Sequence, residues 1–201
     1  MQKLQIATSN WHPRLSSFLI GERNNQFFFR PDKLNVAMKK SLQLLYKLQT
    51  QNKRILFVTT RPQLEPIVKK TAERLNQDYL AGKWIGGQFT NSCVQANLLA
   101  AAASNSKYNG RPDCVVLLDP TNDILREAAA IRVPVISLFD SNANLAERMI
   151  VNTGRQKPTF DTFPKEKWIH YIIPSPNTSF SFIYNFLNLI TKTLMLSSKA
   201  R

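Results

Sequence analysis

The sequence predicts a three-layer α/β/α domain around a mostly parallel sheet of about five strands. Short apolar, β-branched runs alternate with amphipathic segments of helical period, and no repeat or low-complexity tract interrupts the alternation. A length of 201 residues suits one substantial domain rather than two. Strands that are apolar throughout indicate a parallel sheet with helices on both faces, as in flavodoxin-like and Rossmann-like folds.

The first predicted elements are a hairpin and a long helix. Residues 18–20 and 26–29 form the hairpin strands, which turn through residues 22–25. Asp32 is the expected N-cap of the following helix. The apolar positions of this helix recur at helical spacing and are Leu34, Ala37, Met38, Leu42, Leu45 and Leu48.

Four buried strands are predicted from their apolar sequences, at residues 55–59, 114–118, 135–139 and 169–173. Thr60, with Gln63 three residues later, resembles a capping box that starts the next helix. The apolar stripe of that helix is Leu64, Ile67, Val68, Thr71, Ala72 and Leu75. Residues 92–103 and 121–131 supply two more helices.

The last third of the chain departs from this alternation. Residues 142–167 carry Asn, Gly, Pro and mixed charge, which predicts a surface loop or insertion within one domain over residues 1–201. Residues 180–196 contain Asn185, Asn188 and Lys192 and are short for a membrane span. We therefore expect residues 178–197 to form a helix that covers the core, and no membrane association.

Positive charge is concentrated at the two ends of the chain. Lys and Arg number 27 against 13 Asp and Glu, a formal net charge of +14. The net charge is +10 over residues 1–76, −1 over residues 77–150 and +5 over residues 151–201. Such a surface attracts polyanions, of which a nucleic-acid backbone is the commonest.

Cysteine and histidine are too few for a disulfide framework or a four-ligand zinc site. The chain has two cysteines, Cys93 and Cys114, and two histidines, His12 and His170, which lie far apart in the sequence. The first eight residues lack the apolar stretch of a secretory signal. We expect no secretion and no bound cofactor.

Two predicted strands are followed by aspartates, Asp119 and Asp140. At the carboxyl edge of a parallel sheet, a pair of carboxylates could hold Mg²⁺ or act as acid and base. The other interpretation is that each one caps a backbone turn or the following helix. Because no lysine, serine or histidine completes a catalytic set at a recognisable spacing, the sequence favours the second interpretation.

Several basic and planar side chains suit contact with RNA. Lys33, Lys40 and Lys47 are seven residues apart and so fall nearly in line on one helix. Residues 11–14 and 21–24 place Trp, Arg and Asn on turns, where they could stack on bases or contact phosphates. The pair Gly86–Gly87 precedes a predicted helix; it is a weak nucleotide motif, but lets RNA or another element approach the backbone closely.

These segments together resemble the universal small-subunit ribosomal protein S2 family, whose cytosolic relative is ribosomal protein SA. The most specific phrase, residues 83–91, is similar to the family's Trp-Leu-Gly-Gly-x-Leu-Thr-Asn signature. Residues 11–15, 18–24, 55–61, 112–119, 126–128, 133–136, 140–142 and 171–174 are similar to further family phrases in the same order.

The departures from the family pattern suggest an organellar member. The glycine- and histidine-rich phrase before Trp11 is lacking, few residues separate Asn91 from Asp113, and Ser175–Pro176–Asn177 replaces a Gly-Asn. A drifted, basic member without an import signal points to an organelle-encoded protein of the mitochondrial matrix. A plastid or bacterial origin is the alternative.

The resemblance implies a structural role without catalysis in the small ribosomal subunit. The implied partners are the small-subunit rRNA and neighbouring ribosomal proteins, with no independent homo-oligomer. The residues expected to contact rRNA are Trp11, Arg14, Arg23, Asn24, Lys33, Lys40, Lys47, Arg54, Arg61, Lys83, Trp84, Gly86, Gly87, Thr90 and Asn91. Two alternatives stay open: a nucleotide-binding or phosphotransfer enzyme using Asp119 and Asp140 with Mg²⁺, and a free-standing RNA-binding module.

Overall fold

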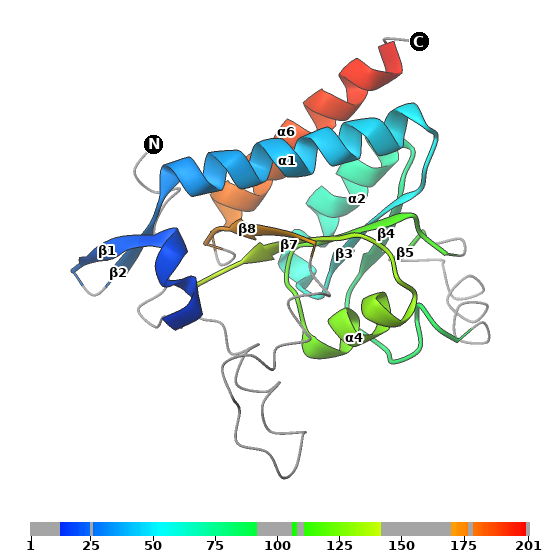
Figure 1. Cartoon of the computed structure of the whole chain (residues 1–201). Coiled ribbons are helices and arrows are strands. Elements are labelled where there is room, and N and C mark those ends of the chain that lie inside the picture. The colour runs from blue at the N-terminus through cyan, green and yellow to red at the C-terminus, as the bar shows by residue number, and fades with distance from the viewer. Residues whose placement is uncertain are drawn as a thin grey trace.

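The computed structural model describes residues 13–24, 26–91, 106–107, 111–141, 170–176 and 179–199 (Figure 1). The strands are β1 (Leu19–Arg23), β2 (Gln26–Phe29), β3 (Ile55–Thr59), β4 (Asp78–Ala81), β5 (Ser106–Lys107), β6 (Cys114–Leu117), β7 (Val135–Phe139) and β8 (Tyr171–Pro174). The helices are α1 (Pro31–Thr50), α2 (Glu65–Leu75), α4 (Asn122–Ala130) and α6 (Phe180–Lys199), with short 3₁₀ helices η2 (Pro13–Phe18) and η3 (Pro62–Leu64).

The main sheet has the order β5-β4-β3-β6-β7-β8. Neighbouring strands from β4 to β8 pair in parallel, and the two-residue β5 is antiparallel to β4 at the edge. The chain therefore adds β4 on one side of β3 and β6 to β8 on the other, which is the flavodoxin-like strand order with its reversal between β3 and β6. The predicted three-layer fold is confirmed.

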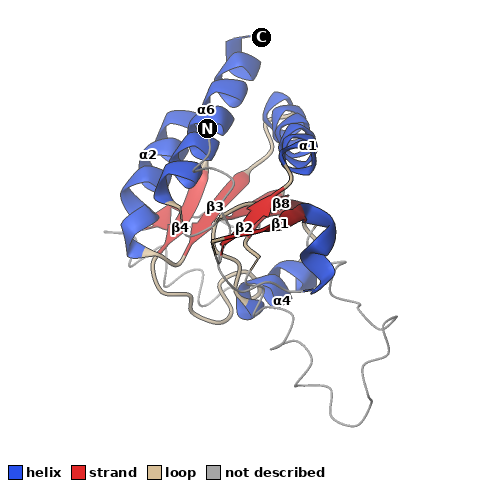
Figure 2. Ribbon diagram, turned by 90° about the vertical axis from the view of Figure 1, so that its left-hand side faces the viewer, coloured by secondary structure: helices blue, strands red, loops and turns tan. Residues whose placement is uncertain are grey.

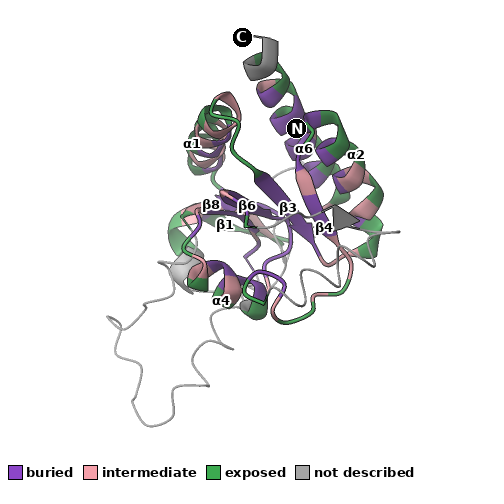
Figure 3. Ribbon diagram, turned by 90° about the vertical axis from the view of Figure 1, so that its right-hand side faces the viewer, coloured by how far each residue is buried: buried purple, intermediate pink, exposed green. Residues whose placement is uncertain are grey.

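Helices cover both faces of this sheet (Figure 2). Helices α1, α2 and α6 lie on one face and α4 lies on the other. Side chains alternate along β3, so that Ile55 and Phe57 pack under α1, α2 and α6, whereas Leu56 and Val58 pack toward α4. All five residues of β3 are buried, as the purple centre of Figure 3 shows.

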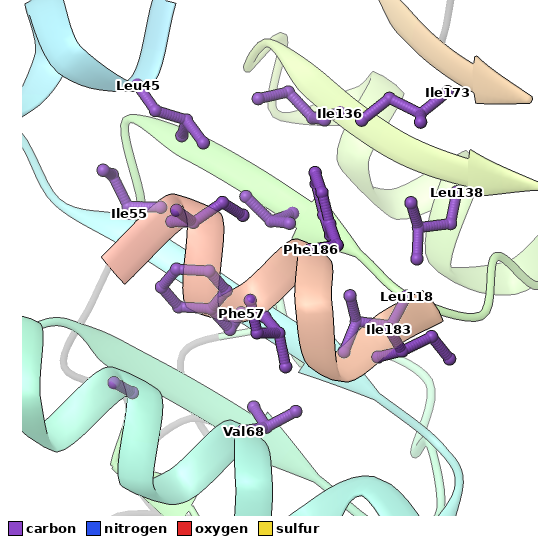
Figure 4. Packing of buried hydrophobic residues seen from close by; sticks show 14 of the residues in the cluster. Leu45, Ile55, Phe57, Val68, Leu118, Ile136, Leu138, Ile173, Ile183 and Phe186 are labelled. Atoms are coloured by element: carbon purple, nitrogen blue, oxygen red, sulfur yellow. The ribbon is translucent and has the colours of Figure 1, made fainter. Parts of the chain in front are cut away.

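The larger core lies between the sheet and the three-helix layer (Figure 4). Phe186 and Ile183 of α6 pack against the strands, with Leu45 of α1 and Val68 of α2 on either side. The buried positions on α6 recur every three or four residues, as predicted for a helix with one apolar face: Phe182, Ile183, Phe186, Leu187, Ile190 and Leu194.

Four of the predicted strands and the hairpin are confirmed with small shifts in their ends. Strand β1 continues to Arg23 and pairs antiparallel with β2, so the turn is shorter than predicted. Strand β8 begins at Tyr171, two residues later than expected. Strand β4 was not predicted, because Asp78–Ala81 contains no β-branched residue. The predicted helix at 92–103 and the loop at 142–167 fall outside the described residues.

Both capping predictions are wrong, and proline explains each case. Helix α1 begins at Pro31 after Arg30, because proline needs no N–H partner in the first turn and has a helical φ. Asp32 is consequently inside the helix, where its charge still suits the positive N-terminal end. At the second site Pro62 starts η3, and the N-cap of α2 is Leu64. The Thr60 hydroxyl does not cap this helix because it donates to Asp119.

Candidate nucleic-acid interface

The lysine stripe predicted on the first helix lies on the exposed side of α1. Lys33, Lys40 and Lys47 are all exposed, whereas Leu34 and Leu45 on the same helix are buried. A step of seven residues returns to nearly the same side of a helix and advances about 10.5 Å along it. The three ammonium groups therefore form a row along α1, which we call the α1 stripe.

The other predicted cations lie at three separate places rather than in one cluster. Arg23 ends β1, and Asn24 forms the hairpin turn with a φ of 54°, both exposed. Arg61 and Lys83 follow β3 and β4 at the carboxyl edge of the sheet. Arg54 precedes β3 and therefore lies at the opposite, amino edge. Trp11 is outside the described residues, as is the side chain of Arg14.

The Gly86–Gly87 turn is held by a carboxylate from α4. The backbone N–H of Gly87 donates to Glu127 Oε1 at 2.6 Å, and that of Phe89 donates to Glu127 Oε2 at 3.0 Å. Gly87 has a φ of 91°, a conformation that favours glycine. The close approach that the sequence suggested for this glycine pair is thus made by another element of the protein.

Trp84 belongs partly to the core beside this turn. Its ring lies edge-on to Phe89 with centroids 4.9 Å apart, and both pack against the cluster under α4. Lys83, Ile85, Thr90 and Asn91 around it are exposed. The segment therefore has an anchored centre, Trp84 and Phe89, and an exposed rim.

The sequence motifs do not single out Glu127, which holds this turn. It appears in the sequence only within the family-like phrase at 126–128, and 40 residues separate it from Gly87.

Asp119 forms hydrogen bonds between the ends of two neighbouring strands. The backbone N–H of Thr60 donates to Asp119 Oδ2 at 2.8 Å, and the Thr60 hydroxyl donates to the same carboxylate. Thr60 follows β3 and Asp119 follows β6, so this contact bridges the reversal point of the sheet. Burial raises the pKa of Asp119 above its usual value, although the hydrogen bonds from Thr60 act in the opposite direction.

Asp140 also bonds to a backbone turn: its Oδ1 accepts the N–H of Ser141 at 2.7 Å. Asp140 thus follows the turn-capping interpretation, whereas Asp119 bonds instead to the residue that follows β3. Within the residues that the structure describes, no three His, Cys, Asp or Glu side chains gather closely enough to hold a metal ion.

Cys114 is a core residue rather than a reactive group. It is fully buried in β6, and burial, with a smaller contribution from the charge of Asp113, raises the pKa of its thiol to about 12. No helix within the described ranges is both long and apolar enough to cross a bilayer.

Comparison with known proteins identifies the family. Residues 4–107 match the family described as "Ribosomal protein S2". The chain is 26% identical over 229 residues to "Small ribosomal subunit protein uS2m" of Marchantia polymorpha, covering 98% of this chain and 87% of that protein. It is 25% identical over 174 residues to "Small ribosomal subunit protein uS2" of Rickettsia canadensis and of Rickettsia prowazekii, covering 68% of this chain and 59% of each relative. Since the family match covers more than half of the sequence and agrees with the fold, the chain belongs to the ribosomal protein S2 family.

Proposed function

We propose that this chain is a structural constituent of the small ribosomal subunit that binds its rRNA and packs against neighbouring ribosomal proteins. The observation that carries the proposal is the family match over residues 4–107. The relatives from Marchantia polymorpha and the two Rickettsia species, which are all named as small ribosomal subunit proteins, support it. The net charge of +14 suits a polyanionic partner.

Binding would begin with electrostatic contact between the α1 stripe and RNA phosphates. Phosphate contacts fix position and orientation without reading sequence, which suits a protein that has one fixed place in a particle. Reversing the charges of Lys40 and Lys47 to Glu should weaken binding to small-subunit rRNA and flatten its dependence on salt. Unchanged binding by this double variant would exclude the stripe as a contact surface.

The described carboxylates favour a structural role over the enzyme alternative. Asp119 is bonded to Thr60 and Asp140 to Ser141, so each carboxylate stabilises a turn of the protein itself. The reversal point between β3 and β6, where doubly wound enzymes bind ligands, is bridged by the Asp119–Thr60 contact.

We propose that these ribosomes are mitochondrial. The Marchantia polymorpha protein named uS2m aligns with 98% of the chain, whereas the Rickettsia proteins align with 68% of it. The strongly basic composition and the departures from the bacterial pattern agree with an organellar member. Plastid and bacterial ribosomes are the alternatives that fractionation distinguishes.

The test is sucrose-gradient sedimentation of a mitochondrial fraction, with this chain detected by antibody at high Mg²⁺ and again after EDTA. Comigration with small subunits and monosomes, followed by a shift to subunit fractions when EDTA splits the monosomes, is the expected result. A signal only at the top of the gradient would refute the ribosomal role. A particle-bound signal in plastid or cytoplasmic fractions instead would refute the mitochondrial assignment alone.

A further inference from the structure

Four cationic residues lie at the amino edge of the sheet, where β3, β6 and β7 begin. Lys53 and Arg54 precede β3, Arg111 precedes β6 and Arg132 precedes β7, and all four are exposed. These strands are direct neighbours in the sheet, and adjacent strands are about 4.8 Å apart. Their leading loops therefore share one surface, which we call the amino-edge patch (Lys53, Arg54, Arg111 and Arg132). In Figure 1 it lies toward the end where α1 leads into β3.

Two of these arginines are oriented by hydrogen bonds to carbonyl groups. The Arg54 guanidinium donates to the backbone oxygen of Arg111 at 2.8 Å, and the Arg111 guanidinium donates to the backbone oxygen of Ile131. These bonds fix the direction in which the two guanidinium groups point. An Arg side chain has five N–H donors in a planar fork, a geometry that matches the oxygens of a phosphate.

Among the residues that the structure describes at this edge, carboxylates balance part of the positive charge. Among the described residues that lead into β3, β6 and β7, Asp113 is the one carboxylate; it accepts the backbone N–H of Arg54 at 2.9 Å and lies 3.7 Å from the Lys53 ammonium. Asp78 begins the neighbouring β4 and is half-buried. Four cations against these two anions leave a formal excess of two positive charges.

Helix ends account for only part of the patch. Cations are favoured near the C-terminal ends of helices, and the bond from Arg111 to Ile131, just after α4, is such a contact. Arg132 follows the C-cap of α4 in the left-handed position (φ 54°) that commonly ends a helix, so its charge suits that end as well. Arg54 bonds a loop carbonyl instead. Stabilisation of helix ends therefore does not account for the orientation of Arg54.

We propose that the amino-edge patch binds phosphates of the RNA backbone, as a second contact beside the α1 stripe. Lys47 is in the last turn of α1, and the Lys53 N–H donates to Leu48 O at 2.9 Å, so the stripe leads directly to the patch. One RNA strand lying along α1 would meet the oriented arginines at the end of the helix. This inference rests on the proposed function, since it assigns a further surface to the same rRNA partner.

The experiment measures binding of the purified full chain to transcribed small-subunit rRNA over a series of KCl concentrations. The variant is Lys53→Gln with Arg132→Asn, which removes two charges, leaves the two anchored arginines in place and puts an amino acid that tolerates a positive φ at position 132. The matched control, Lys70→Gln with Lys192→Gln, removes two exposed charges from α2 and α6. Thermal unfolding confirms that all three proteins are folded.

We expect the variant to bind roughly tenfold or more weakly near 0.1 M salt, with the slope of log K against log[salt] smaller by about 1 to 2, while the control stays close to wild type. Equal loss in variant and control would show a dependence on net charge alone and overturn the patch. Normal rRNA binding by the variant, combined with loss from small subunits in gradients, would assign the patch to an acidic protein and overturn the RNA proposal. If wild type itself fails to bind rRNA, the proposed function fails, and the patch fails with it.

Discussion

The carboxylate of Glu127 gives the most specific prediction, because it holds the turn that carries the family signature. Glu127→Ala removes two hydrogen bonds, from the N–H groups of Gly87 and Phe89, at 2.6 and 3.0 Å. Hydrogen bonds to a charged group contribute about 1.5–3 kcal/mol each when buried, and both the turn and the carboxylate here are partly solvated. We therefore expect a loss of about 2–4 kcal/mol in the free energy of unfolding.

Glu127→Gln should fall between wild type and alanine. Its amide keeps one acceptor oxygen and presents an NH₂ donor to the second backbone N–H, so one of the two bonds is lost and about half of the alanine effect is expected. Urea unfolding at constant pH, extrapolated linearly to water, measures each difference. The matched control is Glu73→Ala, an exposed carboxylate on α2, which should change stability by at most about 0.5 kcal/mol. Equal effects of Glu127→Ala and Glu73→Ala would refute the role assigned to this contact.

Three further predictions concern the core and the carboxyl edge. The Cys114 thiol is buried and has a pKa of about 12, so it should not react with thiol reagents at pH 8 until the protein is unfolded. The measurement uses the Cys93→Ser variant, and rapid labelling of its folded form would contradict the burial of Cys114. Phe186→Ala should destabilise by about 3–5 kcal/mol in the same urea assay, since the ring is 1% exposed; a loss below about 1 kcal/mol would show that the core has closed around the gap. Burial raises the pKa of Asp119, so the folded state binds the proton of this carboxyl more tightly than the unfolded state does. The free energy of unfolding of wild type, relative to that of Asp119→Asn, should therefore fall as pH rises from 3.8 through the raised pKa. A difference that is independent of pH would contradict this.

The fold could be predicted because its central strands have sequences that only a doubly covered parallel sheet accommodates. Residues 55–59 and 135–139 are apolar at nearly every position, and both are strands with the predicted bounds. Strand β4 is short, begins with Asp78 and forms because β3 offers it a pairing edge. That stabilisation comes from tertiary structure and leaves little signal in the local sequence.

The candidate site shows the same division between local and distant information. The spacing of Lys33, Lys40 and Lys47 predicts a stripe because helical geometry depends only on neighbours along the chain, and all three are exposed on α1. The bond between Glu127 and Gly87 joins positions 40 residues apart. The residues of the amino-edge patch are likewise brought together by the order of the strands. Spacing along the sequence therefore predicts neither the Glu127–Gly87 contact nor this patch.

The hairpin formed by β1 and β2 is stabilised separately from the main sheet. Its apolar side chains, Leu19 and Phe29 with Phe18 and Phe27, form a small cluster apart from the two clusters of the main sheet. A two-stranded unit with so little apolar contact opens with a much lower free energy than a central strand. Amide hydrogens of the hairpin should therefore exchange with deuterium long before those of β3 and β6. The hairpin, which carries Arg23 next to its turn, can therefore change conformation without disturbing the packing of the main sheet.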